Sequence, residues 1–190
     1  GSAPIPDAVE ETLNQVAASL ANDQFGIAMV KVIFQHFGSE VGRSTMWIEN
    51  YGERVAVETD YVTRFGSFEE PNRRQAYWDG DRLYSRDLTN GQLFDIGLRQ
   101  KNMEPAAVTI TSPADLQSVG YEHLGAMTIA GQTCDHWRNP AIRYETCFWN
   151  RIELLSINGL LEDGGFSLKY EAVEIVEGEG IPDEIRALGG

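Results

Sequence analysis

The sequence predicts an α+β protein in which a few helices cover one curved antiparallel sheet of about ten strands. Two observations lead to this fold class. From residue 28 onward, short runs alternate between apolar and polar residues, which is the period of a strand with one buried face. Turn sequences such as Asp79-Gly80 and Asn90-Gly91 separate these runs, as expected for a succession of hairpins.

The chain of 190 residues shows no internal repeat, low-complexity tract or long linker, so we expect residues 1–190 to form a single domain. Gly1 and Ser2 resemble the remnant of a purification tag. The residues after them have neither the basic start nor the apolar core of a signal peptide. We therefore expect any export signal to have been removed.

An amphipathic helix is expected first. Asp7 and Glu10 have the spacing of a capping box. The apolar residues that follow recur at helical spacing on one face: Val9, Leu13, Val16 and Leu20. A second, short helix is expected after Ser112, which would cap it, with Pro113 at its first position and Leu116 and Val119 as its apolar anchors.

The strands begin with a long alternating run at residues 28–35. We expect the others at residues 44–50, 54–61, 74–78, 82–87, 92–96, 124–129, 133–138, 142–149, 152–157 and 166–176. Residues 65–72 show no period and predict a surface loop. Residues 181–188, with the sequence IPDEIRAL, predict one closing helical turn.

The formal charge is −14, from 15 basic and 29 acidic residues. Such a surface repels phosphate groups, so we expect no nucleic-acid partner. The most apolar segment, residues 26–34, is short and contains Lys31, so we expect no transmembrane segment. The acidic excess is instead suited to solubility or to docking on a basic protein.

Cys134 and Cys147 flank the turn sequence Asn139-Pro140-Ala141-Ile142. A hairpin centred between Pro140 and Ala141 places the two cysteines opposite each other, at a separation that a disulfide tolerates. Two free thiols and a metal site are the alternatives. A disulfide would indicate an oxidising compartment.

The same register places His136 opposite Glu145, so these two side chains and both cysteines could supply four zinc ligands. We favour a disulfide beside a solvent-exposed His–Glu pair, because flat strand faces seldom arrange four ligands as a tetrahedron. We accordingly expect no metal site.

No common catalytic motif is present, and the carboxylates Asp79, Asp81, Asp87 and Asp95 all fall at or next to turns, where Asp is favoured for its backbone hydrogen bonds. We expect no enzyme, no catalytic residue and no cofactor.

Aromatic residues on the expected strands are the candidate ligand contacts, although large rings are equally suited to an ordinary core. The candidates are the aromatic residues Trp47, Trp78, Tyr84 and Phe94, together with Ile96, which shares a strand face with Phe94.

Several phrases resemble the LolA/LolB-like superfamily of lipoprotein carriers and related exported proteins. The opening helix, the hairpin pair at residues 77–96 and the later phrases at residues 124–137, 146–159 and 181–188 carry this resemblance. The chain departs from the pattern at Ala187-Leu188, where the final proline is missing. The resemblance implies a half-open barrel with a helical lid, whose concave apolar face holds acyl chains in the periplasm.

Two functions are therefore expected. The first is a non-enzymatic periplasmic carrier or chaperone for a hydrophobic ligand such as a lipid or a lipoprotein acyl chain. The alternative is an acidic protein–protein interaction module of the cell envelope, which would dock on a basic partner and take no small ligand.

Overall fold

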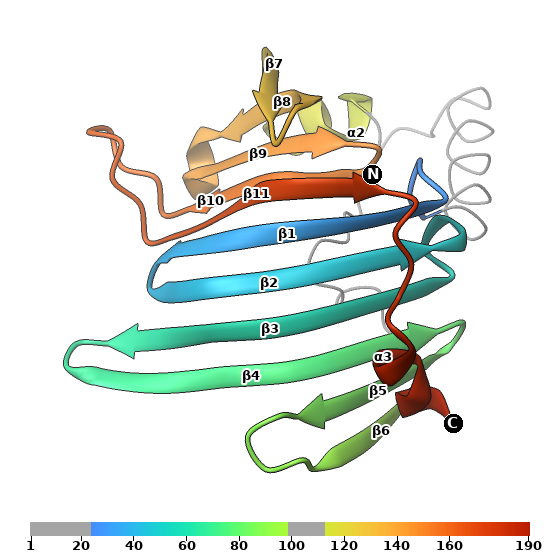
Figure 1. Ribbon diagram of the computed structural model, residues 1–190. Coiled ribbons are helices and arrows are strands. Elements are labelled where there is room, and N and C mark those ends of the chain that lie inside the picture. Colours follow the sequence, from blue (N-terminus) through green and yellow to red (C-terminus); the bar gives the residue numbers. More distant parts are fainter. Residues whose placement is uncertain (1–23, 99–112) are drawn as a thin grey trace, which may run out of the picture.

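The computed structural model describes residues 24–98 and 113–190, and its strands form a single antiparallel sheet (Figure 1). The eleven described strands are β1 (Met29–Gly38), β2 (Glu40–Glu49), β3 (Arg54–Phe65), β4 (Phe68–Asp79), β5 (Arg82–Asp87), β6 (Leu93–Leu98), β7 (Glu122–Ile129), β8 (Gln132–Asn139), β9 (Tyr144–Trp149), β10 (Ile152–Asn158) and β11 (Leu168–Glu177). The described α-helices are short: α2 (Pro113–Ser118) and α3 (Asp183–Arg186). None of the helices in these residues is long and apolar enough to cross a lipid bilayer.

The strand order is β6-β5-β4-β3-β2-β1-β11-β10-β9-β8-β7, so β1 lies in the middle and pairs with β2 on one side and β11 on the other. Apart from β1 and β11, strands that pair in the sheet also follow one another in the chain. Each half of the sheet is therefore a series of hairpins. β6 and β7 form the two edges, so the sheet is not closed. The predicted fold class, an antiparallel sheet of about ten strands, is confirmed. The expected N-terminal helix lies outside the described residues.

The prediction of a surface loop at residues 65–72 is wrong. β3 continues to Phe65 and β4 begins at Phe68, and these two residues pair across a tight turn. At this turn Gly66 adopts a φ of +60°, a left-handed conformation that favours glycine. The end of the hairpin is exposed on both faces, and therefore the alternation that identifies a half-buried strand is missing here.

One face of the sheet, called the inner face below, carries the larger apolar core. Along β1 it is formed by every second residue, Val30, Val32 and Phe34, and the paired residues of β2 and β3 continue it with Ile48 and Val57. The disulfide-bonded cysteines and residues of β7, β10 and β11 belong to the same cluster.

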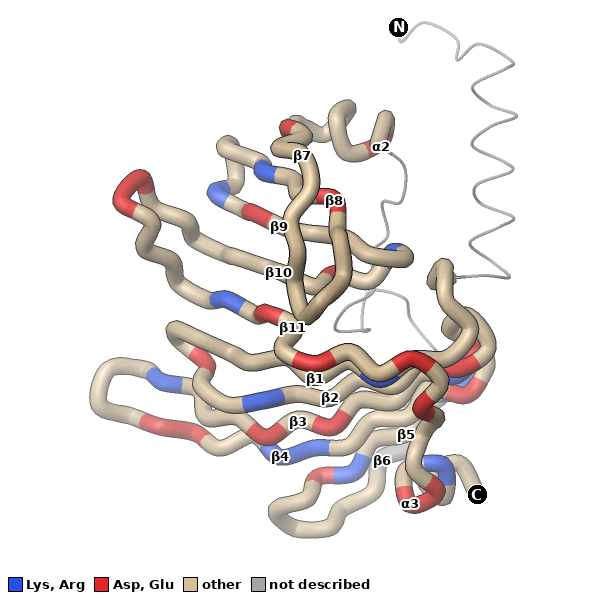
Figure 2. The backbone as a smooth tube through the Cα atoms, turned by 45° about the horizontal axis from the view of Figure 1, so that its top comes forward, with Lys and Arg blue, Asp and Glu red and all other residues tan. Residues whose placement is uncertain are grey.

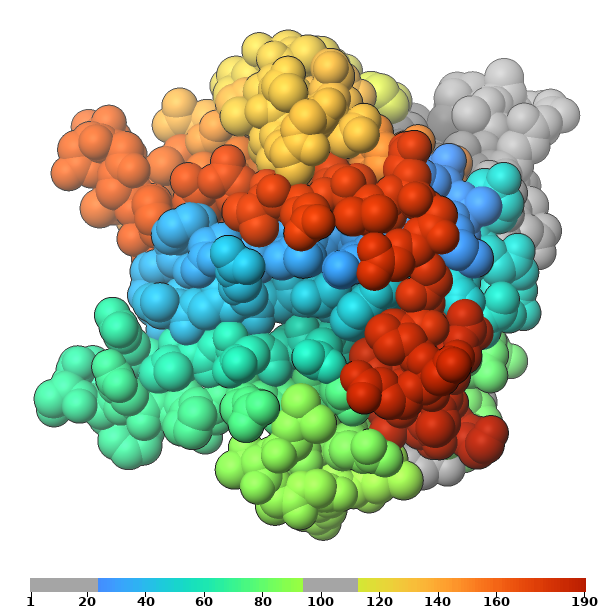
Figure 3. All heavy atoms as spheres, in the orientation of Figure 1, coloured from blue at the N-terminus to red at the C-terminus, as the bar shows by residue number. Residues whose placement is uncertain are grey.

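The opposite, outer face holds a smaller apolar cluster under the C-terminal residues 181–188. Figure 3 shows this segment, in red, running across the sheet. Its residue Ile185, in α3, is fully buried. Arg186 pairs with Glu49 of β2, whose side chain is almost completely buried. The predicted closing turn is confirmed.

The middle helix also appears where the sequence predicts it. Leu116 is buried and anchors α2, as expected. The expectation for Val119 is wrong, because this residue follows the helix and is exposed.

Candidate ligand-binding site

A cavity of about 220 Å³ opens on the inner face. Its lining comes from five neighbouring strands: Phe34, His36, Glu40, Ser44, Met46, Val57, Thr59, Tyr61, Glu153, Ser156 and Tyr170. β3 and β10 stand four strand positions apart, about 19 Å in a flat sheet. Because residues of both line one small cavity, the sheet curves toward this face, as predicted.

The floor of the cavity is apolar. Phe34, Met46 and Val57 follow one another on β1, β2 and β3, and each is buried, with exposed fractions of 6%, 2% and 4%. These side chains also belong to the main core cluster, so the cavity is an unfilled extension of the core toward solvent.

One wall is a hydrogen-bonded group around His36, whose side chain is buried. Its Nδ1 lies 3.2 Å from Glu40 Oε2 and its Nε2 lies 2.8 Å from Ser44 Oγ. The same Glu40 oxygen accepts a hydrogen bond of 2.8 Å from the Tyr170 hydroxyl. Because a carboxylate can only accept, a neutral His36 donates through Nδ1 and accepts from Ser44 through Nε2. Burial lowers the pKa of His36, and the nearby Glu40 opposes this shift.

Aromatic rings extend this wall. The His36 ring centroid lies 5.0 Å from that of Tyr61 and 4.4 Å from that of Tyr170. Gly42 is the β2 residue between His36 and Tyr61 in the ladder, and its φ is +149°. A Cβ there would lie 2.3 Å from Asp60 O. Glycine therefore lets the rings on β1 and β3 meet across β2.

A second carboxylate, Glu153 of β10, lies on the other side of the cavity. It accepts hydrogen bonds from the hydroxyls of Tyr144 at 2.5 Å and Thr146 at 2.7 Å. Burial raises the pKa of Glu153 above its ordinary value of 4.5, while these hydroxyl groups and Ser156 act in the opposite direction. Two acidic groups therefore share one small, partly enclosed space.

The candidate ligand contacts from the sequence lie elsewhere. Trp78 is packed in the main core cluster. Trp47 and Tyr84 point to the outer face, where they pack with the C-terminal segment. None of these three lines the cavity. Phe94 and Ile96 lie on β6, and their side chains fall outside what the structure describes.

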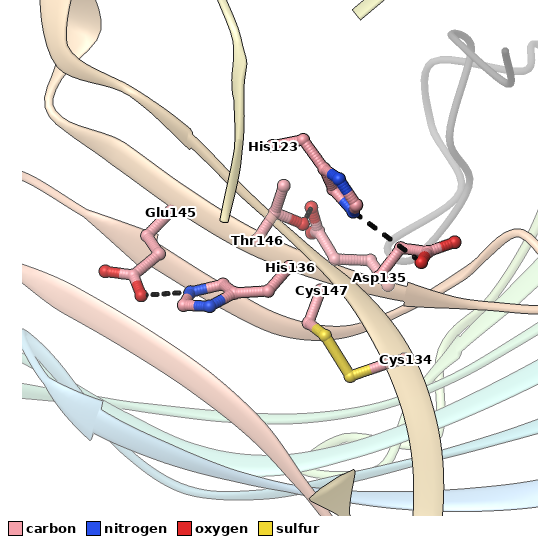
Figure 4. The surroundings of a disulfide bond; sticks show 8 residues. His123, Cys134, Asp135, His136, Glu145, Thr146 and Cys147 are labelled. Carbon is pink, nitrogen blue, oxygen red and sulfur yellow. Dashed lines mark hydrogen bonds and ion pairs between the residues drawn. A yellow bond between two sulfur atoms is a disulfide. The ribbon is translucent and has the colours of Figure 1, made fainter. Parts of the chain in front are cut away.

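The predicted disulfide between Cys134 and Cys147 is present, with 5.6 Å between the Cα atoms (Figure 4). The predicted register is wrong. The loop comprises Pro140–Ile142 and the left-handed Arg143, so the ladder pairs Cys147 with His136. Moving the hairpin centre by one residue moves each partner by two, which leaves the side chains on the same face. The cysteines are therefore diagonal neighbours.

His136 and Glu145 are likewise diagonal neighbours, and His136 Nε2 contacts a Glu145 oxygen (Figure 4). The expectation that this pair is solvent-exposed is wrong, because each side chain is only 18% exposed. Since both sulfurs are in the disulfide, neither is free as a zinc ligand. In residues 24–98 and 113–190 no group of three or more His, Cys, Asp or Glu residues is arranged to hold a metal ion.

The fold and cavity define an open-sheet β-rich protein with a small inner-face cavity. No protein-family model and no curated protein matches the sequence. An uncharacterised conserved protein from Thermus thermophilus matches this chain with 13% identity and a TM-score of 0.51, over 95% of this chain and 93% of its own. This match shows a shared fold.

Structures of MucB are also similar, with lower scores. One crystal structure of MucB has 15% identity and a TM-score of 0.46, over 96% of this chain and 63% of MucB. MucB in the Pseudomonas aeruginosa MucA/MucB complex has 17% identity and a TM-score of 0.48, over 93% and 59%. The chain thus spans about three fifths of these MucB chains. At these scores, neither family membership nor function is transferred from MucB.

Proposed function

We propose that this chain is a non-enzymatic binding protein, a carrier or chaperone, that holds the apolar part of a ligand in the inner-face cavity. The supporting observation is the cavity itself, an apolar floor left open on the concave face of an unclosed sheet. A lipid or a lipoprotein acyl chain is the ligand that suits this floor. This proposal assigns no catalytic residue.

The size of the cavity limits how much of a ligand it encloses. Its volume of about 220 Å³ exceeds the ~150 Å³ of an engineered apolar cavity that binds benzene. It is smaller than the ~300–1,000 Å³ of pockets that enclose a whole drug-sized molecule. The cavity therefore takes one end of an acyl chain, and the remainder of the ligand lies outside it.

The disulfide supports a location in an oxidising compartment, because such bonds are rare where thiols are kept reduced. We place the protein in the bacterial periplasm or an equivalent exported location. Liquid chromatography with mass spectrometry of protein taken from whole cells tests this, since a protein of a reducing compartment would carry free thiols.

Two adjacent substitutions on β2 test ligand binding. Ser44 lines the cavity, whereas Thr45 is its neighbour on the opposite face. Ser44→Phe fills the cavity and is expected to weaken the binding of a neutral fluorescent alkanol, such as a pyrene-labelled decanol, by at least about tenfold, a loss of about 1.4 kcal/mol. Thr45→Phe is the matched control and should bind as the wild type does. Failure of the wild type to bind the probe would refute the proposal.

The second candidate is the acidic interaction module, supported by the formal charge of −14. In Figure 2, Asp and Glu are spread over strands and turns with Lys and Arg among them, rather than gathered in one patch. Co-purification of a basic envelope protein, with a yield that falls steeply as salt rises, would favour this candidate. If Ser44→Phe co-purifies as much of this partner as the wild type does, the interaction does not depend on the cavity.

A further inference from the structure

Within residues 24–98 and 113–190, neither carboxylate at the cavity is paired with a Lys or Arg side chain. Among the described lining residues there is no Lys or Arg. The partners of Glu153 are hydroxyl groups, and those of Glu40 are the Tyr170 hydroxyl and the His36 ring. Burial lowers the pKa of His36, which keeps that ring neutral at neutral pH. Arg74 on β4 acts on Tyr61 but is exposed and does not line the cavity. The cavity is therefore acidic and not neutralised: burial raises the pKa of Glu153, and a cation placed between the two carboxyl groups would favour their ionised forms.

The aromatic wall favours the same sign of ligand charge. The ring faces of Tyr61 and Tyr170 are electron-rich, and the His36 ring lies between them. A cation within about 6 Å of an aromatic ring face is attracted to it, most strongly where water is excluded. A cavity that combines carboxylates with aromatic ring faces is suited to binding organic ammonium groups.

The apolar floor favours a cation that also has an alkyl group. A bare metal ion prefers several oxygen ligands and a hydrated surrounding, and gains nothing from Phe34, Met46 and Val57. An alkyl chain attached to the ammonium group would cover these side chains. The volume of about 220 Å³ accommodates a group somewhat larger than benzene.

We propose that the cavity selects amine-bearing amphiphiles, with the ammonium group between Glu40 and Glu153 and the first carbons of its alkyl chain on the floor formed by Phe34, Met46 and Val57. The inference rests on the proposed binding function and makes its ligand class specific. An aminated lipid and a simple alkylamine share this recognised chemistry. Fatty acids, whose carboxylate would face two acidic side chains, are excluded.

Isothermal titration calorimetry with three probes of equal chain length tests this selectivity: hexylammonium, 1-hexanol and hexanoate. We use about pH 7.5, at which an amine with a pKa close to that of Lys is protonated. Salt of about 0.15 M screens the general attraction of an acidic protein for cations. Hexylammonium is expected to bind at least about tenfold more tightly than hexanol, and hexanoate more weakly than both.

Substitutions of the two cavity glutamates test where the ammonium group binds. Glu40→Gln and Glu153→Gln should each reduce the affinity for hexylammonium by about tenfold and change that for hexanol by less than about twofold. Glu69→Gln is the matched control, because Glu69 is an exposed carboxylate on β4 that pairs with Arg64. It removes the same charge and should leave both affinities unchanged. Ser44→Phe should abolish binding of hexylammonium, which places it in the cavity.

The outcomes distinguish this inference from the proposed function. Hexanol binding as tightly as hexylammonium, or hexanoate binding best, overturns the inference and leaves the apolar binding site intact. Binding of none of the three overturns both. Because the three probes are compared on the wild-type protein, the test holds even if a glutamate variant fails to fold.

Discussion

At the scale of single residues, the cavity depends on polar side chains placed where a strand pattern calls for apolar ones. His36 continues the inner-face series Val30, Val32 and Phe34, and Ser44 precedes Met46 in the same phase. Polar residues at positions where the alternation calls for buried apolar ones, together with Gly42 in the middle of a strand, are recognisable in the sequence and indicate a site. It locates His36 but not Glu153, which reaches the cavity from β10 through strand pairing that no local pattern encodes.

Glu153 gives a prediction about stability and pH. Burial raises its pKa in the folded protein above the ordinary value of 4.5, so above that pH the folded state holds the proton more firmly than the unfolded state does. Stability contributed by this group therefore falls as pH rises from 4.5 through the folded-state pKa. Relative to Glu153→Gln, the wild-type free energy of unfolding should fall by up to about 1.4 kcal/mol per pH unit in that window.

Urea denaturation of both proteins from pH 4 upward measures this difference, in which the titration of all other groups largely cancels. Glu69→Gln, at an exposed position, is the control for the loss of a glutamate side chain. A difference for Glu153→Gln that is flat, or that rises with pH, would contradict the effect of burial on this carboxyl group.

At the scale of elements, hairpin geometry explains which predictions hold. The disulfide prediction is confirmed although its register is wrong, because a shift of two residues keeps side chains on their face, and Cys134 and Cys147 remain within reach at 5.6 Å. The loop prediction for residues 65–72 fails because both faces of that hairpin end are exposed. Periodicity therefore predicts strands where burial is one-sided, while loop length, which here depends on the left-handed Arg143, is not encoded in periodicity.

The disulfide gives a prediction at this scale. It closes a sequence separation of 13 residues, and a loop of about that size is worth about 3 kcal/mol through the reduced entropy of the unfolded chain. The double variant Cys134→Ser/Cys147→Ser should therefore unfold at a lower urea concentration. Reduced wild-type protein should lose a similar amount. A denaturation midpoint that stays unchanged in both samples would show that the bond does not stabilise the fold.

At the scale of the whole molecule, the sequence predicts the architecture much better than the site. Alternation and turn signals define most strands, and their succession yields an open antiparallel sheet. They do not tell which face is concave, because alternation marks the two faces of a strand equally and does not reveal that β1 pairs with the distant β11, with a register shift at Ile33/Phe34. As a result, the candidate ligand contacts Trp47 and Tyr84 pack instead on the outer face under the C-terminal segment.

Methyl NMR of protein labelled with ¹³C at the methionine methyl groups, titrated with 1-hexanol, directly tests whether the inner-face cavity receives an apolar ligand. The chain contains four methionines, of which Met46 forms part of the cavity floor and Met29 lies at the start of β1 outside it. Binding at the inner face predicts a saturable shift of the Met46 methyl signal and none for Met29. A Met46 signal that does not move at saturating hexanol would contradict the claim that this cavity receives an apolar ligand.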